Sequence, residues 1–452
     1  MFKPASRLHD VFDNEAQLLA WADEVDEIAQ FISDFGGLTP ERVWSVLTHW
    51  TTQTGNRDEI MKYAVPKSYP TIARIVRENA QHMPEPPKIE LARRVSDNWI
   101  DFTFMDLFAG IGGFHLGLSS QGGSLVFASE WDRAARLTYL ANYGVLPFGD
   151  IREFTRRPSG TPRQSHDIRS RVPRADIITA GFPCQPFSKA GVSSRNHHGH
   201  AHGLRCEAQG TLFEDILLIA AATEPDALIL ENVGNLRFHD GGNTIRVILN
   251  EIEKTGYRVY PKWDNSNNWG VLESSLVSAQ RRRRVYMVCI REDLAEALEH
   301  KKGEFRIQSP KTKPNLRTLR QVINRDKSMT DHEKYERYGI SERMWESHLR
   351  RETAHKKKGN GFRIGLMSDL DTVSPTLVAR YHKDGKDCLI PSTKPGAPPR
   401  MLTPRECALL QTYPESFRIP SSKTSAFKQF GNSVTVEMVR LISRQVVSYL
   451  YG

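Results

Sequence analysis

The sequence predicts an α/β fold in which helices cover both faces of a doubly wound, parallel sheet. Two observations after residue 100 support this prediction. Short apolar runs typical of strands alternate with segments of helical periodicity. Three of the apolar runs end in the segments FAGIGG, GFPCQP and ENVGN. Ligands bind such sheets at the carboxyl ends of the strands, so we expect the functional residues in these three segments.

The alternation places five strands and the helices between them. The predicted strands cover residues 102–108, 124–130, 175–181, 226–232 and 285–290. The helix-like segments between these strands are FHLGLSSQ, RAARLTYLANY, TLFEDILLIAAAT and NTIRVILNEIEKTG.

The regions before residue 100 and after residue 300 lack this alternation of strands and helices, which predicts separate domains. Residues 1–80 have apolar positions at helical spacing, and MPEPPK at 83–88 is typical of a linker. Residues from about 300 to 400 are basic, rich in glycine and proline and weakly periodic, which favours a smaller second domain. Two helical segments follow, and the last, TVEMVRLISRQVVSYL, can pack back on the sheet. The predicted domains are residues 1–99, 100–300, 301–400 and 401–452.

Charge and cysteine content narrow the class of protein. The net charge is +9, and basic runs gather at 281–284, 301–320 and 349–358, which favours a nucleic-acid surface over three unrelated solvated faces. The five cysteines form no C-x-x-C pair, which indicates a reducing compartment rather than a disulfide frame. No apolar run reaches the ~18–20 residues of a membrane span, and the N-terminus lacks a secretory signal. We therefore expect an intracellular, cytoplasmic protein.

The segment DLFAGIGG (106–113) predicts a nucleotide site at a strand-to-helix turn. Its glycines let a ligand approach backbone NH groups, although their spacing is not G-x-G-x-x-G and tight packing is an alternative explanation. Glu130 ends the next strand, where a carboxylate can accept both ribose hydroxyls. Trp131 offers an aromatic face, and Asp150 in FGDI is a further polar candidate. Together they predict an adenosine-containing cofactor.

Cys184 opens the loop after the third predicted strand, between two prolines. A free cysteine is usually a buried structural thiol, but the end of a strand exposes this side chain to the cleft. Five histidine and cysteine residues follow at 197–206 with a spacing unlike an ordered zinc module. A deaminase zinc site needs P-C-x-x-C, and Phe187 stands at its second cysteine position. The remaining hypothesis is a nucleophile, which needs a lowered pKa or a nearby base.

Glu231 ends the fourth predicted strand in ENVGNL. A carboxylate there would be costly without a role or a partner, and a structural salt bridge is the alternative. QRRRR (280–284) precedes the last strand. Arg282 and Arg284 point the same way along an extended segment, so they can form bidentate hydrogen bonds with a carboxylate, a phosphate or a base edge.

The order FAGIGG, PCQPFS, ENV, Q-x-R-x-R and GNSV resembles the cytosine-5 DNA methyltransferase family. The resemblance covers residues ~101–300 and ~400–450 and includes the order and spacing of all five motifs. It implies a Rossmann-like, S-adenosylmethionine-dependent methyltransferase core with a smaller target-recognition domain and a helical N-terminal extension. TPRECALLQTYPESF departs from the family at Thr412 and Tyr413, which stand where Gly-Phe is usual.

The resemblance also implies roles for individual residues. Glu130 would bind the ribose of S-adenosylmethionine, Trp131 would pack on the cofactor and Asp150 would reach its adenine. The remaining cofactor-binding residues would be Phe108, Gly110, Gly112, Gly113, Asn432 and Val434, with Asn432 bracing the site. Cys184 would be the nucleophile, Glu231 would hold the protonated N3 of cytosine, Arg284 would orient the base and Arg282 would lie beside it. No metal is expected.

The expected partner is double-stranded DNA with a short palindromic site. Ser188 and the segment from Lys189 to about Thr211 match the loop that closes over DNA, and residues 301–400 fall where the family keeps its target-recognition domain. The other candidate DNA contacts are Thr376, Arg380, Tyr381 and Lys383. The sequence segments of this region most resemble those of bacterial enzymes of restriction–modification or solitary systems that modify CC-containing sites such as CCNGG or CCGG. We further expect a monomer that is associated with the bacterial nucleoid and can be paired with a restriction endonuclease.

Two other functions fit parts of the pattern. A tRNA cytosine-5 methyltransferase would share the chemistry, but the ~100-residue basic insert after QRRRR favours reading of duplex DNA in the major groove. A non-catalytic DNA-binding regulator would leave Cys184 and Glu231 dispensable, although both stand in intact motifs.

Overall fold

The computed structural model describes residues 101–183, 212–264, 266, 269–310, 315–359, 363–392, 394 and 396–452, together with Arg42, Ser45, Val46, Thr48 and His49. These residues divide into two compact units. The first is drawn from Met1–Leu272, Arg284–Gln308 and Arg440–Gly452, and the second from Glu273–Arg283 and Ser309–Val439. Apart from the five N-terminal residues just named, the helices predicted within residues 1–80 lie outside the described residues.

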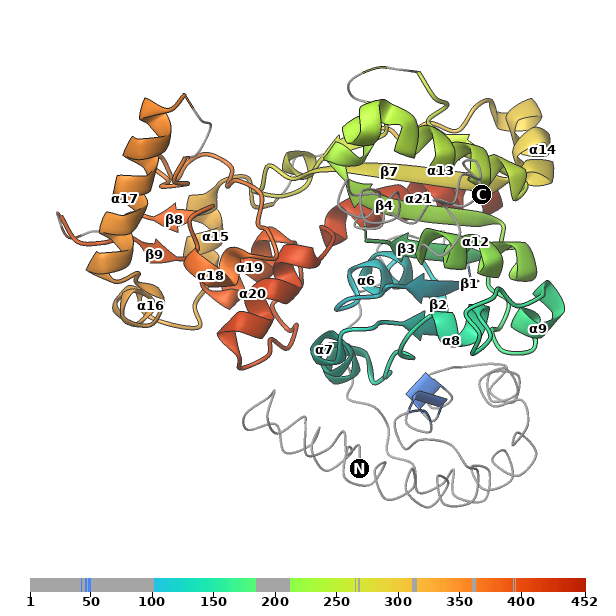
Figure 1. The fold of residues 1–452 in the computed structure, drawn as a ribbon, viewed down its shortest axis with the longest axis horizontal. Coiled ribbons are helices and arrows are strands. Elements are labelled where there is room, and N and C mark those ends of the chain that lie inside the picture. Colours follow the sequence, from blue (N-terminus) through green and yellow to red (C-terminus); the bar gives the residue numbers. More distant parts are fainter. Residues whose placement is uncertain are drawn as a thin grey trace, which may run out of the picture. The chain divides into compact units, whose positions relative to one another are not determined.

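A mixed sheet forms the centre of the first unit (Figure 1). From one edge to the other its strands are β2 (Gly123–Ser129), β1 (Phe102–Leu107), β3 (Ile177–Gly181), β4 (Ala227–Val233), β7 (Arg283–Arg291) and β5 (Tyr257–Tyr260), and β6 (Val271–Glu273) pairs with β7. The five predicted strands correspond to β1, β2, β3, β4 and β7. The sequence did not predict β5 and β6, whose runs of four and three residues are too short for a clear alternation.

The direction of β7 differs from the expectation. β1, β2, β3 and β4 pair in parallel, but β7 runs antiparallel to both β4 and β5. The expectation of a wholly parallel sheet is therefore wrong for the strand predicted at 285–290. The chain reaches β7 from β6 through the short 3-10 turn η4 (Ser274–Leu276), and an antiparallel strand needs no crossover helix.

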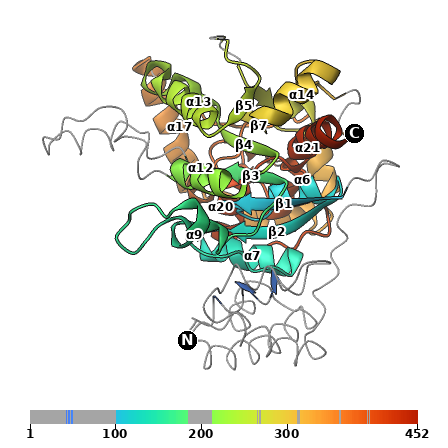
Figure 2. The ribbon, with the colours of Figure 1, turned by 90° about the vertical axis from the view of Figure 1, so that its right-hand side faces the viewer.

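Helices cover both faces of this sheet, as expected (Figure 2). One face carries α12 (Leu212–Thr223) and α13 (Asn243–Lys254), and the other carries α6 (Gly113–Ser119), α14 (Glu292–Lys302) and α21 (Val436–Tyr451). The C-terminal helix does pack back on the first unit: Ser443 Oγ donates to the carbonyl of Gly117, and Tyr451 stacks on Phe102 of β1. The α/β fold class is therefore confirmed.

Three further helices lie between β2 and β3 in the chain. They are α7 (Arg133–Tyr143), α8 (Arg152–Thr155) and α9 (Ser165–Arg169), and α8 and α9 pack against α12. Asp132 caps α7 by accepting from the NH groups of Ala134 and Ala135, and Gly144 ends it in the left-handed conformation. A 3-10 segment, η3 (Gly234–Gly242), follows β4.

The second unit is mainly helical. Its elements are α15 (Leu319–Arg325), α16 (Asp331–Tyr338), α17 (Glu342–Lys357), α18 (Tyr381–Asp384), β8 (Leu389–Ile390), β9 (Arg400–Met401), α19 (Pro404–Leu410) and α20 (Lys423–Asn432). A buried ionic cluster joins several of them. Arg400 makes a bidentate contact with Glu406 at 2.8 Å on both arms, and the ammonium of Lys334 lies 3.5 Å from Glu406 and donates to the carbonyl of Asp326. Removal of one member would leave a charge buried without its partner.

Three of the five cysteines lie in the described part of the chain. Cys289, Cys388 and Cys407 are free, buried thiols, and burial raises the pKa of each. Cys184 and Cys206 lie outside the described residues. Among the helices of the described part of the chain, none has the length and apolar content needed to span a bilayer.

Candidate active site

The ends of β3 and β4 bring the two expected cytosine-binding motifs side by side. Gly181 at the end of β3 is paired with Glu231 near the end of β4. A Cβ built on Gly181 would lie 3.6 Å from Oε2 of Glu231, so this carboxylate lies directly against the backbone that leads to Cys184. Cys184 itself, Ser188 and the segment from Lys189 to Thr211 lie outside the described residues.

Glu231 forms an ion pair with Arg284. The Nε of Arg284 lies 3.0 Å from Oε1 of Glu231, and the two side chains are 14% and 11% exposed. Arg284 reaches this position because β7 runs antiparallel to β4, which pairs Val233 with Arg284. The structure therefore contains the salt bridge that the structural alternative predicted. It also keeps part of both groups open to the carboxyl edge of the sheet, where a ligand can reach them.

Asn232, the residue after Glu231, is a positioning residue that sequence reasoning missed. Its amide nitrogen donates to the carbonyl of Phe182 over 2.9 Å, and its side chain is 2% exposed. The hydrogen bond therefore fixes the backbone two residues before Cys184. The only available signal was its place in ENVGN, since a polar residue buried at the end of a strand needs a partner.

Arg282 belongs to the second unit and has a different set of partners. It is 2% exposed and donates to the carbonyls of Leu377, Gly431 and Ser433 at 2.7, 3.1 and 2.7 Å. It therefore ties the Thr376-Leu377 pair to the GNSV turn. Arg282 and Arg284 therefore have different partners, since Arg284 is bound to Glu231, and the catalytic roles expected for both stay predictions.

The GNSV segment is also held by a close backbone approach. A Cβ on Gly431 would lie 2.4 Å from the carbonyl of Val378, so only glycine fits there. Asn432 ends α20 and is exposed, whereas Val434 is 7% exposed. Both lie in the second unit, whereas the other expected cofactor residues lie in the first. Their assignment stays a prediction.

The glycine-rich turn after β1 has the left-handed backbone that its sequence suggests. Phe108, Gly110 and Gly112 have φ values of 56°, 56° and 82°, and Gly113 begins α6. A non-glycine residue such as Phe108 rarely adopts this conformation, and such positions cluster at functional sites. No atom of the described residues lies within 4 Å of a Cβ built on Gly110, so these residues leave space on that side of the turn.

Glu130 joins this turn to the end of β2. Its Oε2 accepts from the NH of Gly110 over 2.8 Å and its Oε1 accepts from the NH of Asp132 over 2.6 Å. Burial raises the pKa of Glu130, while these NH groups act in the opposite direction. Each oxygen keeps a second lone pair, so the oriented carboxylate can still accept two hydroxyl groups.

Tyr143 contacts the turn, and Asp106 lies in β1 just before it. The Tyr143 hydroxyl donates to the carbonyls of Ile111 and Gly112 at 3.1 and 2.9 Å, and its ring leaves no room for a Cβ on Gly112. Asp106 is fully buried, accepts from the hydroxyl of Thr179, and has its pKa raised well above the usual value by burial. This buried carboxyl group of β1, just before the turn, is a feature that the sequence did not indicate.

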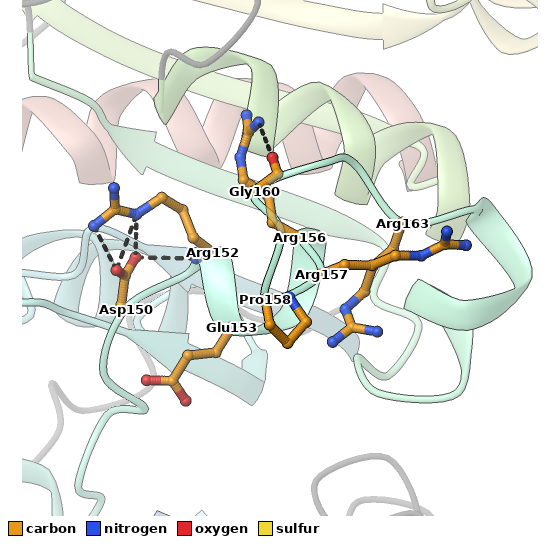
Figure 3. Close-up of a pocket in the computed structure, with 8 residues that line it drawn as sticks. All are labelled: Asp150, Arg152, Glu153, Arg156, Arg157, Pro158, Gly160 and Arg163. Atoms are coloured by element: carbon orange, nitrogen blue, oxygen red, sulfur yellow. Dashed lines mark hydrogen bonds and ion pairs between the residues drawn. The ribbon is translucent and has the colours of Figure 1, made fainter.

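Trp131 and Asp150 lie on either side of one arginine. Trp131 is 69% exposed, and the guanidinium of Arg152 lies 5.2 Å from the centre of its ring. Arg152 also donates from Nε to both oxygens of Asp150 at 3.0 and 2.9 Å and from Nη2 at 2.6 Å (Figure 3). The exposed aromatic face and the carboxylate are thus linked into one polar surface, which Arg152 orients.

An open pocket of about 630 Å³ adjoins Asp150 (Figure 3). Its arginines are largely neutralised, because Arg156 pairs with Glu214 and Asp215 and Arg163 pairs with Asp167. The pocket is thus an extension of the Asp150 surface rather than a separate anion site. Its lining residues are Asp150, Arg152, Glu153, Arg156, Arg157, Pro158, Gly160 and Arg163.

Of the expected DNA contacts in the second unit, Tyr381 is corrected by the structure. It is 1% exposed, its hydroxyl donates to the carbonyl of Cys388 and accepts from the NH of Leu402, and its ring packs on Phe427. The side chain thus belongs to the core, because its polar group is satisfied internally. Arg380 and Lys383 are exposed, and the Thr376 hydroxyl donates to the carbonyl of Arg281. Among the described residues no cluster could hold a metal ion.

Comparison with known proteins identifies the family of this chain. A profile of the C-5 cytosine-specific DNA methylases matches residues 102–448. A "DNA-cytosine methyltransferase" of Escherichia coli (strain K12) is 37% identical over 374 residues, covering 76% of this chain and 77% of that protein. The type II methyltransferase M.DsaV of Dactylococcopsis salina is 36% identical over 348 residues, covering 77% of this chain and 86% of that protein.

Solved structures support the fold. The chain resembles the S. pombe Dnmt2 methyltransferase with a TM-score of 0.53 at 18% identity, covering 78% of this chain and 100% of that one. The match of the methylase profile from β1 to the C-terminal helix, together with the relatives just described, shows that this chain belongs to the C-5 cytosine-specific DNA methylase family.

Proposed function

We propose that this chain is a DNA (cytosine-5) methyltransferase, which transfers a methyl group from S-adenosylmethionine to C5 of a cytosine in double-stranded DNA. The observation that carries the proposal is the pairing of Glu231 with Arg284 beside Gly181 and Phe182, immediately before Cys184. A carboxyl group, an arginine and a cysteine at neighbouring strand ends are the groups needed to activate a cytosine ring.

The β1 and β2 edge fits an adenosine-containing cofactor. Glu130 is oriented with lone pairs left for ribose hydroxyls, Trp131 offers an exposed face for a base, and the described residues leave space at the Cβ position of Gly110. Asp150 can accept from an adenine amino group. When bound, S-adenosylmethionine supplies an electrophilic methyl group. The residues of the chain would hold its adenosine.

The chemistry that these residues support has a simple order. The thiolate of Cys184 forms a bond to C6 of the cytosine, which makes C5 nucleophilic. Glu231 accepts a hydrogen bond from the protonated N3 and stabilises the developing charge, and Arg284 holds Glu231 and the base edge in position. After methyl transfer, loss of the C5 proton restores the double bond and expels Cys184. Both faces of the ring must be reachable, so the cytosine leaves the helix, which costs a few kcal/mol.

The second unit would read the DNA sequence. We assign residues 301–400 to target recognition, with Thr376, Arg380 and Lys383 as candidate contacts, and residues 1–99, 100–300 and 401–452 to the N-terminal extension, the catalytic core and the returning C-terminal region. The basic runs of this part of the chain support a phosphate-binding surface. The proposed target is a short CC-containing palindrome such as CCNGG or CCGG, modified by a bacterial monomer that protects DNA from a paired endonuclease.

The test is methyl transfer from tritiated S-adenosylmethionine to duplex DNA and to tRNA in parallel. We expect label in DNA and not in tRNA, and a covalent complex with DNA that contains 5-fluorocytosine. Cys184→Ala should abolish both turnover and the covalent complex. Label in tRNA alone would overturn the DNA assignment, and a complex that persists in the variant would overturn the nucleophile. Bisulfite sequencing of DNA from expressing cells gives the target sequence.

A further inference from the structure

Five residues from the N-terminal region contact the segment that carries Asp150. These five residues are helical, and they are the residues before position 101 that the structure describes. We call them the brace: Arg42, Ser45, Val46, Thr48 and His49. Their partners lie about 100 residues later in the chain, at the edge of the sheet formed by β2. Nothing in the sequence motifs concerned these residues.

The brace first binds the backbone just before the Asp150 turn. The hydroxyl of Thr48 accepts from the NH of Leu146 over 2.9 Å, and the hydroxyl of Ser45 donates to the carbonyl of Pro147 over 3.3 Å. Arg136 of α7 donates to the same carbonyl over 2.7 Å and to Ser45 over 3.4 Å. Two consecutive residues are thereby anchored by side chains rather than by strand pairing.

The brace also packs against the rings on both sides of the turn. His49 stacks on Phe148 with 4.6 Å between ring centres. The guanidinium of Arg42 lies 4.7 Å from the Phe148 ring and 4.3 Å from the Phe154 ring, and it pairs with Glu153 at 3.5 Å. Val46 is 1% exposed and belongs to the hydrophobic core of the first unit. Residues 148–154, which include Asp150, are therefore held from both ends.

His49 connects this turn to the strand that carries Glu130. Its Nε2 accepts from the NH of Ala128 over 3.1 Å, so the proton lies on Nδ1, which donates to the carbonyl of Ser45 over 2.7 Å. Ala128 and Phe148 are themselves joined, since the NH of Phe148 donates to the carbonyl of Ala128 over 2.8 Å. One neutral imidazole thus contacts both chain segments two residues before Glu130 and Asp150.

We propose that the brace, through His49 and Thr48, is a positioning element of the cofactor site that sets the separation of Glu130 and Asp150. The roles of these two carboxylates rest on the proposed function. Neither His49 nor Thr48 touches the reacting atoms. Their loss should loosen the Asp150 turn and weaken binding of the adenosine part of the ligand, while the chemistry at the ends of β3 and β4 keeps its groups.

The test uses the full chain and two kinds of substitution. Thr48→Val keeps the volume but removes the acceptor for Leu146, and His49→Leu removes the acceptor for Ala128. The conservative partners Thr48→Ser and His49→Gln retain an acceptor at the same place. Tyr257→Phe is the matched control, because it removes a buried hydrogen bond to the Pro225 carbonyl before β4, at the opposite end of the sheet.

Two measurements decide the proposal. Hydrogen exchange of residues 146–154 in the ligand-free protein should rise about tenfold in Thr48→Val and His49→Leu but not in Tyr257→Phe. Calorimetric Kd values for S-adenosylhomocysteine should rise about tenfold in the same two variants, with most of the affinity regained in Thr48→Ser and His49→Gln. At saturating S-adenosylmethionine, kcat should change less than KM for that cofactor.

Each contrary outcome has a clear meaning. Unchanged hydrogen exchange in residues 146–154 would overturn the proposed role of the brace. An equal loss of affinity in Tyr257→Phe would overturn it too, because the effect would then be general destabilisation. If the wild-type chain binds no S-adenosylhomocysteine, the proposed function fails. The exchange measurement still decides in that case whether the brace holds the turn.

Discussion

Arg284 and Glu231 lie 3.0 Å apart at the end of two antiparallel strands, next to the backbone that leads to Cys184. The ion pair fixes the carboxyl group in one orientation while leaving part of it accessible. This relationship turns a buried acidic residue, which would otherwise be costly, into a group that can meet the edge of a base.

Removal of either partner should therefore slow methyl transfer without unfolding the sheet. Glu231→Gln removes the carboxylate that holds the protonated N3 and should lower kcat by roughly 10²–10⁴-fold. Arg284→Ala should lower kcat by on the order of 10²-fold, because a positioned donor is lost. Single-turnover assays on duplex DNA measure both. Arg283→Ala, at the neighbouring exposed position, is the control and should retain activity; equal losses in all three variants would contradict specific roles.

Asn232 should act on the same step through the backbone. Asn232→Ala leaves the buried Phe182 carbonyl without its donor, which costs about 1–3 kcal/mol of folding stability. We expect kcat to fall and the KM for S-adenosylmethionine to stay constant, since the cofactor turn is not involved. Thermal unfolding and steady-state kinetics check the two effects. An altered cofactor KM with normal kcat would show that Asn232 supports a different site.

Arg152 should control cofactor affinity. Arg152→Ala frees the Asp150 carboxylate and uncovers Trp131, so binding of S-adenosylhomocysteine should weaken by on the order of 1 kcal/mol. Titration calorimetry gives the affinity, and tryptophan fluorescence reports the surroundings of the indole. Arg174→Ala is the matched control, because Arg174 is exposed and pairs with Glu224 instead. Unchanged affinity would mean that Asp150 is oriented without Arg152.

Thr412 carries a measurable backbone strain. It stands where the family usually has glycine, and its φ is 59°, a conformation that is unfavourable for a β-branched residue. Its hydroxyl compensates by donating to the carbonyl of Gln411 over 2.7 Å and accepting from the NH of Glu437 over 2.8 Å. Thr412→Ala keeps the strain and loses both bonds, so it should be less stable than Thr412→Gly by about 1 kcal/mol. Denaturant unfolding of the pair gives the order, and the reverse order would contradict it.

Two buried histidines should make stability depend on pH. Burial lowers the pKa of His49 from 6.5 to about 4 and that of His115 from 6.5 to about 3. The contribution of the two neutral histidines to the free energy of unfolding is complete above pH 6.5. It is lost as the pH falls towards 4, because the unfolded chain then binds more protons than the folded chain. Each histidine contributes a slope of about 1.4 kcal/mol per pH unit in this window. Denaturant unfolding from pH 7 to 5 measures the slope, and His332→Ala, at an exposed position, should leave it unchanged.

The strand ends could be predicted because their signals are local. Apolar runs marked β1, β2, β3 and β4, and the acidic residues Glu130 and Glu231 stand at the ends of such runs. The direction of β7 could not be predicted in this way, since an apolar strand reads the same in either direction. Tyr381 was predicted as a DNA contact, and only its contacts with Cys388 and Leu402 show that it is buried.

The sequence by itself determined the chemistry of this protein, because the order of the glycine turn, the cysteine loop, Glu231 and the arginines specifies which groups are available. Tertiary structure decided which of those groups meet. Arg284 reaches Glu231 while Arg282 binds carbonyls of Leu377 and Gly431, and His49 reaches Ala128 across 79 residues of chain. The physical reason is that residue type and periodicity are local properties. Distances and burial arise from packing between segments that are far apart in the sequence.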